Sequence, residues 1–402
     1  MLSNTVFHYF DHNATTPVCA EVIAALPEFA AAGGNPSSIH WGGRQPKNLI
    51  RDARKAIADA FNISPLEIVF TSGGSEANNT VLKGLFDYYQ TAQFLTPEQR
   101  RRTHFMCSAV EHPSVMKTMA HLQNLGARVD YIPVSRTGEI DLKFYEEHLT
   151  EETALVSVMF ANNETGTLFP IKQMAAMAHA KGALFHTDAV QGFGKAVLNF
   201  KELDVDFASI SGHKFYSIKG TGLLYMKKGS NVSPLIHGGG QERHRRGGTE
   251  NTLGIACLGL MAKRAPLIEA RAQEVKKLRD HMEARIVSEI EDVTITAVET
   301  ERLSNTSSLV IKGADGETML MSLDIKGYAV STGAACSSGN PEPSPVLLAM
   351  GLSRAEAQNS LRVSLGWETT LEEVDGFVET LKTVVARLRS LSEEEEGDSC
   401  HV

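Results

Sequence analysis

The chain has 402 residues, more than one compact core usually holds, so we expect two domains. Hydrophobic residues make up 42% of the chain and charged residues 22%, a balance that excludes a disordered protein and predicts a soluble globular one. The formal net charge is −9, which argues against direct binding to nucleic acid.

The start of the chain and its cysteines indicate where the protein works. Residues 1–4 have neither a basic stretch nor an apolar run, so no signal peptide is expected. No apolar stretch reaches the roughly 18–20 residues of a membrane span. The five cysteines are widely spaced and form no Cys-x-x-Cys pair, which argues against a zinc site or a disulfide framework. We therefore expect a cytoplasmic protein with no metal site and no membrane contact.

The first part of the chain predicts a strand, a loop and a helix. Residues 7–17 form a short apolar strand that enters a polar turn, where Asn13 either contacts a ligand or belongs to a cap at a domain edge. Residues 33–43 are rich in turn formers and predict a surface loop. Residues 44–61 have the apolar spacing of a helix.

A glycine turn follows the next predicted strand, residues 68–71. The turn contains Gly74 and Ser75, and a helix is expected from Glu76. Unpaired N–H groups at such a turn, together with the helix dipole, favour an anion. Many turns between strand and helix contain glycines, so this signal alone is weak, but it makes Gly74 and Ser75 candidates for a phosphate site.

Strands alternate with helices as far as about residue 230, which predicts an α/β domain. The strands are expected at 104–108, 129–134, 154–160, 183–187 and 207–210, with a helix at 171–181. Polar residues follow several of these strands, where ligands collect in α/β folds. His112 is one of them, and it is either a surface or capping residue or a group that stacks on a cofactor and transfers protons.

Lys214 and Asp188 suggest the chemistry. Lys214 comes soon after a buried strand, where an ammonium is costly unless it is neutralised or used. A desolvated lysine of lowered pKa is suited to forming an imine with an aldehyde cofactor. Asp188 follows another apolar strand and offers a carboxylate to a pyridinium nitrogen. Pyridoxal 5'-phosphate (PLP) enzymes need this pair of residues.

The C-terminal half contains two further candidates, Cys336 and Arg362. An apolar helical face over residues 275–290 marks a second domain, with strands near 293–296 and 307–311. Cys336 lies among small residues before a proline-rich segment, which indicates a reactive thiol on a loop. Arg362 lies on an apolar strand and either binds a carboxylate or forms a structural ion pair.

Two charged segments complete the chain. Residues 237–249 form a basic, glycine-rich stretch that is either a solvated loop or a source of phosphate donors, among them Thr249. After a helix expected near 371–391, residues 392–402 are acidic, and we expect this tail to be disordered. Cys400 lies in the tail, and we expect no catalytic role for it.

Ten motifs in order resemble the cysteine desulfurases of the NifS/IscS type, which belong to the class V, fold-type I PLP enzymes. They are FDHNATTP, GNPSSIHWGGR, FTSGGSEANN, EHPSV, NNETGT, HTDAVQ, SGHKFYSIKGTG, GGGQERHRRGGTEN, STGAACSSG and LRVSLG. The resemblance implies a large, mainly parallel-sheet α/β domain over residues 15–262. It also implies a smaller α+β domain, built from residues 1–14 and 263–391, that carries the cysteine loop.

The resemblance also assigns roles to single residues. Lys214 would hold PLP, and Cys336 would accept sulfur. The other cofactor contacts would be Gly74, Ser75, His112, Asn163, Asp188, Gln191, Ser211, His213 and, from a second subunit, Thr249. Asn163 and Arg362 would bind the substrate carboxylate, with Asn13 a further substrate contact. Ser75 stands where a threonine is more usual, which keeps the hydroxyl.

The implied reaction converts L-cysteine to L-alanine and leaves a persulfide on Cys336. A homodimer and a sulfur-acceptor protein are implied as well. The acidic tail does not resemble the tail with which some relatives dock an iron–sulfur scaffold, so the acceptor stays open between iron–sulfur assembly and thio-modification. Selenocysteine lyase, a class V aminotransferase and a non-catalytic scaffold of the same fold are the alternatives.

Overall fold

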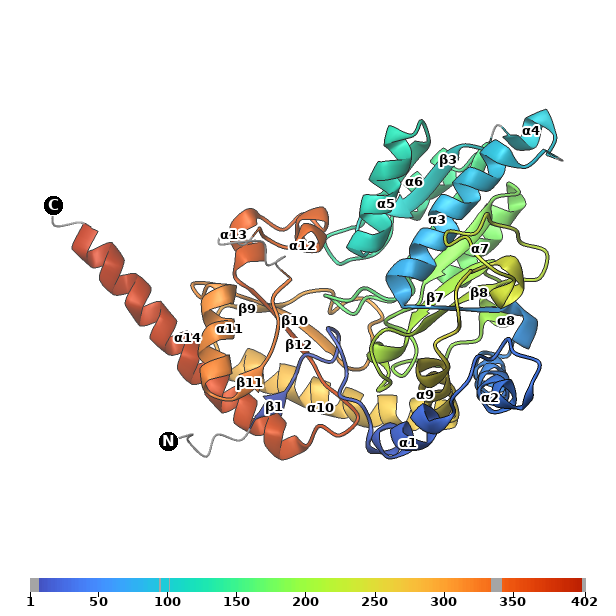
Figure 1. Cartoon of the computed structure of the whole chain (residues 1–402). Coiled ribbons are helices and arrows are strands. Elements are labelled where there is room, and N and C mark those ends of the chain that lie inside the picture. Colours follow the sequence, from blue (N-terminus) through green and yellow to red (C-terminus); the bar gives the residue numbers. More distant parts are fainter. Residues whose placement is uncertain (1–6, 94, 101, 334–341, 400–402) are drawn as a thin grey trace.

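A seven-stranded sheet forms the centre of the larger part of the molecule (Figure 1). The computed structural model describes residues 7–93, 95–100, 102–333 and 342–399. All strands run parallel except β8, which is antiparallel to both of its neighbours. The strand order is β2 (Ile68–Thr71), β8 (Gly222–Met226), β7 (Phe207–Ser211), β6 (Leu184–Asp188), β5 (Thr153–Ser157), β3 (His104–Ser108) and β4 (Arg128–Ile132).

Helices cover both faces of this sheet because its central strands are apolar on both sides. Neighbouring residues of one strand, such as Phe105 and Met106, are both buried but belong to different core clusters. Helices α3 (Gly74–Thr91) and α5 (Pro113–Asn124) pack in the cluster of Phe105. The helices of the Met106 cluster are α1 (Ala20–Ala31), α2 (Arg44–Phe61), α6 (Leu142–His148), α7 (Ile171–Ala180), α8 (Phe200–Leu203) and α9 (Thr252–Ala262).

A second sheet, antiparallel and of three strands, lies beside the large one (Figure 1). Its order is β12 (Ser360–Ser364), β10 (Thr306–Ile311) and β9 (Val293–Ile295). Helices α10 (Ile268–Glu289), α11 (Gly316–Ile325) and α14 (Leu371–Ser399) share a third core cluster with it. The N-terminal strand β1 (His8–Tyr9) pairs in parallel with β11 (Tyr328–Ala329) beside this sheet, so the first described residues join the C-terminal ones.

The remaining elements are short. They are α4 (Pro97–Arg100), α12 (Pro345–Ala349), α13 (Arg354–Gln358) and the 3-10 turns η1 (Trp41–Gly43), η2 (Pro65–Glu67), η3 (Gly212–Lys214), η4 (Gln241–His244) and η5 (Ala265–Leu267). Within the described parts of the chain, no helix has both the length and the apolar composition needed to cross a membrane.

Several element boundaries differ from those that the sequence predicts. Helix α3 begins at Gly74, two residues earlier than expected, because Gly73 has a φ of +156° that only glycine adopts readily and ends the strand abruptly. Strand β5 ends at Ser157, not at 160. Helix α14 continues to Ser399, so residues 392–399, expected to be disordered, are helical; glutamate is a good helix former.

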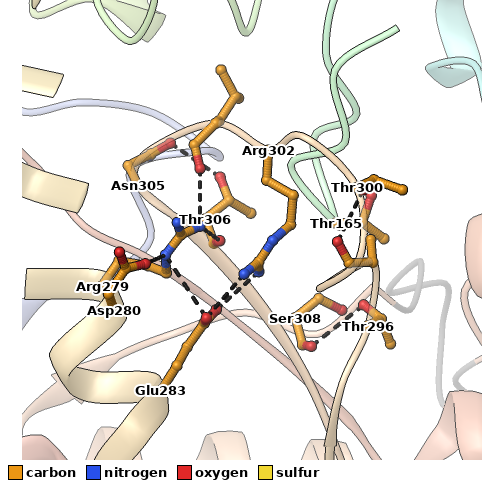
Figure 2. A network of polar contacts seen from close by, with 12 residues as sticks. Thr165, Arg279, Asp280, Glu283, Thr296, Thr300, Arg302, Asn305, Thr306 and Ser308 are labelled. Atoms are coloured by element: carbon orange, nitrogen blue, oxygen red, sulfur yellow. Dashed lines mark hydrogen bonds and ion pairs between the residues drawn. The ribbon is translucent and has the colours of Figure 1, made fainter. Parts of the chain in front are cut away.

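A buried ion network connects α10 to the loop before β10 (Figure 2). Nη1 and Nη2 of Arg302 donate to Oε1 and Oε2 of Glu283, each at 2.9 Å. Arg279 Nε lies 3.8 Å from the same carboxylate, and its Nη1 donates to the carbonyls of Leu303 and Thr306. The side chains of the three charged residues are each at most 8% exposed, so these charges depend on one another for compensation.

We predict that Glu283→Ala destabilises the protein by roughly 3–5 kcal/mol, because it leaves the buried guanidinium group of Arg302 without its carboxylate, whereas Arg279 keeps Asp280 at 2.8 Å. The urea midpoint of unfolding, followed by circular dichroism, measures this loss. The control is Glu274→Ala, which breaks the exposed Arg271–Glu274 pair and should cost at most about 1 kcal/mol. Equal midpoints for the two variants would show that the network adds no stability.

Candidate active site

A cavity of about 300 Å³ opens at the edge of the large sheet where the parallel strands end. Lys214 and Asp188 reach it from the ends of β7 and β6, and Gly74 reaches it from the end of β2. Arg362 enters from β12 of the second sheet. The predicted site residues that line the cavity are Asn13, Gly74, Ser75, His112, Asn163, Asp188, Gln191, Ser211, His213, Lys214 and Arg362.

The side-chain amine of Lys214 has a lower pKa than an ordinary lysine. Its Nζ donates to the backbone carbonyls of Asn13, at 2.6 Å, and Ala14, at 2.8 Å. Burial and then the nearby charge of Arg362 lower the pKa of Lys214 to about 8, although Asp11 and Asp188 raise it. A substantial fraction of neutral amine is therefore present near neutral pH, as a nucleophilic lysine requires.

Asp188 is held by two hydrogen bonds at the end of β6. Its Oδ2 accepts from Asn78 Nδ2 at 2.7 Å, and its Oδ1 accepts from the backbone N–H of Val190 at 3.0 Å. Asn78 also donates to Ser114 Oγ at 2.8 Å. The amide of Asn78 therefore orients the carboxylate and connects it to the start of α5.

His112 caps the N-terminus of α5 and faces the same cavity. Its Nδ1 accepts from the backbone N–H of Ser114 at 3.1 Å and lies 2.8 Å from the Ser114 hydroxyl. Burial lowers the pKa of His112, while Asp188 raises it and Lys214 lowers it. Because Nδ1 is an acceptor, the neutral ring carries its proton on Nε2.

The glycine turn before α3 is shaped for an anion. Helix α3 starts at Gly74, so the unpaired N–H groups of its first turn face the cavity. A Cβ atom at Gly74 would lie 2.5 Å from Val190 Cγ2, so no other residue fits there without displacing its neighbour. His213 also lines this region; burial lowers its pKa to about 4, and its ring is therefore neutral.

Arg362 keeps part of its guanidinium group available. Its Nη2 lies 2.7 Å from Asp11 Oδ1, and its Nη1 donates to the Asn163 carbonyl at 3.2 Å. Its Nε is buried and has no hydrogen-bond partner among the residues that the structure describes. Nη1 and Nη2 each use one hydrogen in the contacts above and keep a second, so the guanidinium group has donors left for an anionic ligand such as a carboxylate in the cavity that it lines.

Thr249 and Cys336 are the two predicted residues that the structure does not place at the cavity. Thr249 is exposed and is not among the residues that line the cavity. Cys336 lies outside the described residues. In the basic stretch around Thr249, Arg246 pairs with Glu76 at 2.9 Å and Arg245 donates to backbone carbonyls near β2. Arg246 therefore holds the first turn of α3, and Arg245 holds the start of β2.

Sequence reasoning missed four residues that belong to the site or contact it. Asn78 and Ser114 are bonded to Asp188 and His112 as described above. Glu111 is buried beside His112, and Lys195 donates to Gln191 and Asn13. A useful signal was available for Asn78, which lies one helical turn after Gly74 and so shares its face of α3.

Known proteins resemble this chain in sequence and in fold. A family model described as aminotransferase class-V matches residues 8–377. The chain belongs to the class V aminotransferase family. A cysteine desulfurase of Trichormus azollae is 42% identical over 386 residues, covering 96% of this chain and 94% of that protein. The cysteine desulfurase IscS of Dictyoglomus turgidum is 40% identical over 386 residues, covering 96% of each. A solved NifS-like protein has a TM-score of 0.87 and 34% identity, covering 95% of this chain and 100% of that one.

These similarities confirm the predicted fold class and the predicted resemblance to NifS/IscS-type enzymes. Members of the family use PLP, and the donor set of the cavity fits that cofactor. Lys214 offers the amine, Asp188 offers a carboxylate, and the turn at Gly74 offers N–H groups to a phosphate.

Glu111 gives the site a testable pH dependence. Its Oε1 accepts from Ser108 Oγ at 2.6 Å and from the Met159 N–H at 2.7 Å, while its Oε2 is buried without a partner among the described residues. Burial raises the pKa of Glu111 to about 8. The folded state keeps this proton where the unfolded chain, with a pKa of about 4.3, has lost it.

Glu111 therefore stabilises the folded state less as pH rises from about 4.5 to about 8. We predict that Glu111→Gln, which is neutral and of the same shape, loses less thermal stability between pH 6 and pH 9 than the wild type, by the equivalent of the two pH units from 6 to 8, roughly 2.7 kcal/mol. Melting temperatures across this range measure it, with the exposed Glu151→Gln as control. Parallel curves for wild type and Glu111→Gln would show that Glu111 is ionised throughout.

Proposed function

We propose that this protein is a PLP-dependent cysteine desulfurase. It converts L-cysteine to L-alanine and transfers the sulfur to Cys336 as a persulfide. The observation that carries the proposal is the single cavity that brings together the amine of Lys214, the carboxylate of Asp188 and the partly free guanidinium of Arg362. The relatives named above support the same activity.

The residues around the cavity divide the work of holding the cofactor. When bound, PLP supplies an electron sink that weakens the bonds at the substrate Cα. Lys214 would hold it covalently, and Asp188, oriented by Asn78, would face its ring nitrogen. The phosphate would lie at the start of α3, with contacts from Gly74, Ser75, Ser211, His213 and the partner subunit's Thr249. His112 would stack on the ring, Asn163 would be a further cofactor contact, and Gln191 would contact the phenolic oxygen.

The substrate carboxylate would be held by Arg362 and Asn163. Arg362 uses one hydrogen each of Nη2 and Nη1 for Asp11 and the Asn163 carbonyl, so the second hydrogens of these nitrogens are left for this contact. The contacts of Asn13 differ from the substrate contact that the resemblance implies. Its side-chain oxygen accepts from Lys195 and Asn305, and its nitrogen donates to Thr306 and to the Asn163 carbonyl. We therefore propose that Asn13 positions the residues around the cavity and does not contact the substrate directly.

Proton transfer and sulfur transfer are assigned to Lys214, His112 and Cys336. Lys214 would remove the Cα proton, for which a pKa of about 8 is suitable. The Cys336 thiolate attacks the substrate sulfur, so an S–S bond forms as the C–S bond breaks. The carbon skeleton takes up protons and leaves as alanine. His112 would take the proton of the substrate thiol at Nδ1, the ring nitrogen without a proton, after that atom exchanges its contact with Ser114 for one with the substrate.

The sulfur must then pass to a second protein. We propose that this acceptor is an iron–sulfur scaffold or a thiolation enzyme, and that the work is done in the cytoplasm, where Cys336 returns to a free thiol. We also propose a homodimer. Its support is the exposure of Thr249 and, in the separate segment of residues 33–43, of two large apolar side chains, Ile39 at 100% and Trp41 at 82%.

A single-turnover reaction with L-cysteine tests the function. We predict that the PLP-loaded wild type forms alanine and becomes about 32 Da heavier through a persulfide. Cys336→Ala should form neither the adduct nor alanine, because no thiolate is present to take the sulfur. Cys400→Ala is the matched control and should behave as the wild type. Alanine is measured by chromatography and the adduct by intact mass.

The opposite outcome is equally clear. Alanine and free sulfide at unchanged rates in Cys336→Ala, without an adduct on the wild type, would contradict transfer through Cys336. That result would favour the selenocysteine lyase alternative, which turnover of L-selenocysteine would then test.

A further inference from the structure

Lys195 is a buried lysine that none of the roles above explains. It is 8% exposed, and none of the ion pairs found among the described residues includes it. Burial lowers its pKa well below the usual value, and the nearby charges of Lys214 and Arg362 lower it further against an opposing effect of Asp11. Keeping a lysine in such a place is costly, so a purely space-filling role would be better served by an apolar residue.

A tight turn after β6 brings Lys195 back beneath the cavity. The backbone N–H of Lys195 donates to the carbonyl of Gly192 at 3.1 Å, and Gly194 has a φ of +85°, which favours glycine. Trp367 Nε1 donates to the Gly194 carbonyl at 2.8 Å and fixes the turn from outside. Lys195 therefore lies four residues after Gln191 with its amine directed at the Gln191 side chain.

The amine of Lys195 decides which way two amides point. Its Nζ donates to Asn13 Oδ1 at 2.7 Å and to Gln191 Oε1. Rotating either amide by half a turn would turn an N–H group toward Nζ in place of the oxygen and break one of these two hydrogen bonds. Both oxygens must therefore face Lys195.

The nitrogen of Gln191 consequently faces away from Lys195. Its Nε2 donates one hydrogen to the Asn13 carbonyl at 3.0 Å, and Gln191 lines the cavity, so the second hydrogen is left for a ligand. The same Asn13 carbonyl accepts from Lys214 Nζ at 2.6 Å. Lys195, Gln191 and Lys214 thus meet at one asparagine, whose side chain is tied to the second sheet through Thr306.

We propose that Lys195 is a positioning residue that fixes the amide of Gln191 so that an N–H group, and not the carbonyl, faces the phenolic oxygen of the cofactor. The proposal rests on the function proposed above. An N–H donor stabilises a negatively charged oxygen, whereas a carbonyl would repel it. Lys195 therefore favours the ionised form of the bound cofactor without touching it.

The visible absorption of the Lys214-bound cofactor, titrated with pH, reads this effect directly. We predict that Lys195→Met raises the pKa of that absorption by about one unit, because the ionised form loses a correctly oriented donor. Lys172→Met, at a lysine on the outer face of α7 that pairs with Glu202, is the control and should titrate as the wild type does.

A double-mutant cycle separates positioning from a simple charge effect. Gln191→Ala alone should also raise the titration pKa. If Lys195 acts through Gln191, then Lys195→Met made in the Gln191→Ala protein should add little further shift. Full addition of the two shifts, or no shift in Lys195→Met, would overturn the proposal.

Two further outcomes keep the test decisive. If Lys195→Met does not fold, Lys195→Gln retains one donor and should shift the titration less than Gln191→Ala does; an equal or larger shift would contradict the proposal. If the wild type with PLP shows no visible absorption that Lys214→Ala abolishes, the proposed function itself fails. A normal wild-type absorption band, together with an unchanged titration pKa in Lys195→Met, would contradict the inference about Lys195 and leave the proposed function intact.

Discussion

The arrangement of the site depends on one asparagine, Asn13, which lies in the turn after the N-terminal strand and is almost fully buried. Its backbone carbonyl accepts hydrogen bonds from both Lys214 and Gln191, and its side-chain amide bonds to Thr306 of β10 on one side and to Lys195 on the other. Through this residue the first few described residues join the two sheets. Because hydrogen bonds from a cationic donor are stronger than neutral ones and all of these lie out of water, a shift of Asn13 would be felt by the amine that performs the chemistry.

Removal of water sets the protonation states around that amine. Burial is the largest cause of the lowered pKa of Lys214, His112 and His213 and of the raised pKa of Glu111. Each of these groups is shifted toward its neutral form, so the cavity has few fixed charges of its own besides Asp188 and Arg362. A cofactor with a phosphate and a charged ring would therefore be bound by contacts with particular residues, and the overall electrostatic potential of the cavity would contribute little.

Much of this could be predicted from the sequence because the signals are local. Lys214, Asp188 and the turn at Gly74 each follow an apolar strand, and the ends of parallel strands meet at one edge of a sheet. The roles of Asn78 and Lys195 could not be predicted in this way. They depend on which amide a side chain faces, and Asn13 and Lys195 are 182 positions apart in the chain. The sequence predicts a disordered acidic tail from residue 392, but α14 continues to Ser399. A run of glutamates is highly charged and yet favours a helix, so charge alone does not predict disorder here.

The single reversed strand of the large sheet affects how the cavity is assembled during folding. Strand β8 pairs with β7, its neighbour along the chain, and the segment between them holds Lys214, so the lysine belongs to a hairpin that forms from local contacts. The glycine turn at Gly74 joins it only when β2 pairs with the other edge of β8, which closes a long loop of chain. The amine and the anion site are therefore separate until the sheet is complete. A cofactor that needs both would bind only the finished sheet, and by mass action it would draw late folding intermediates toward the native state.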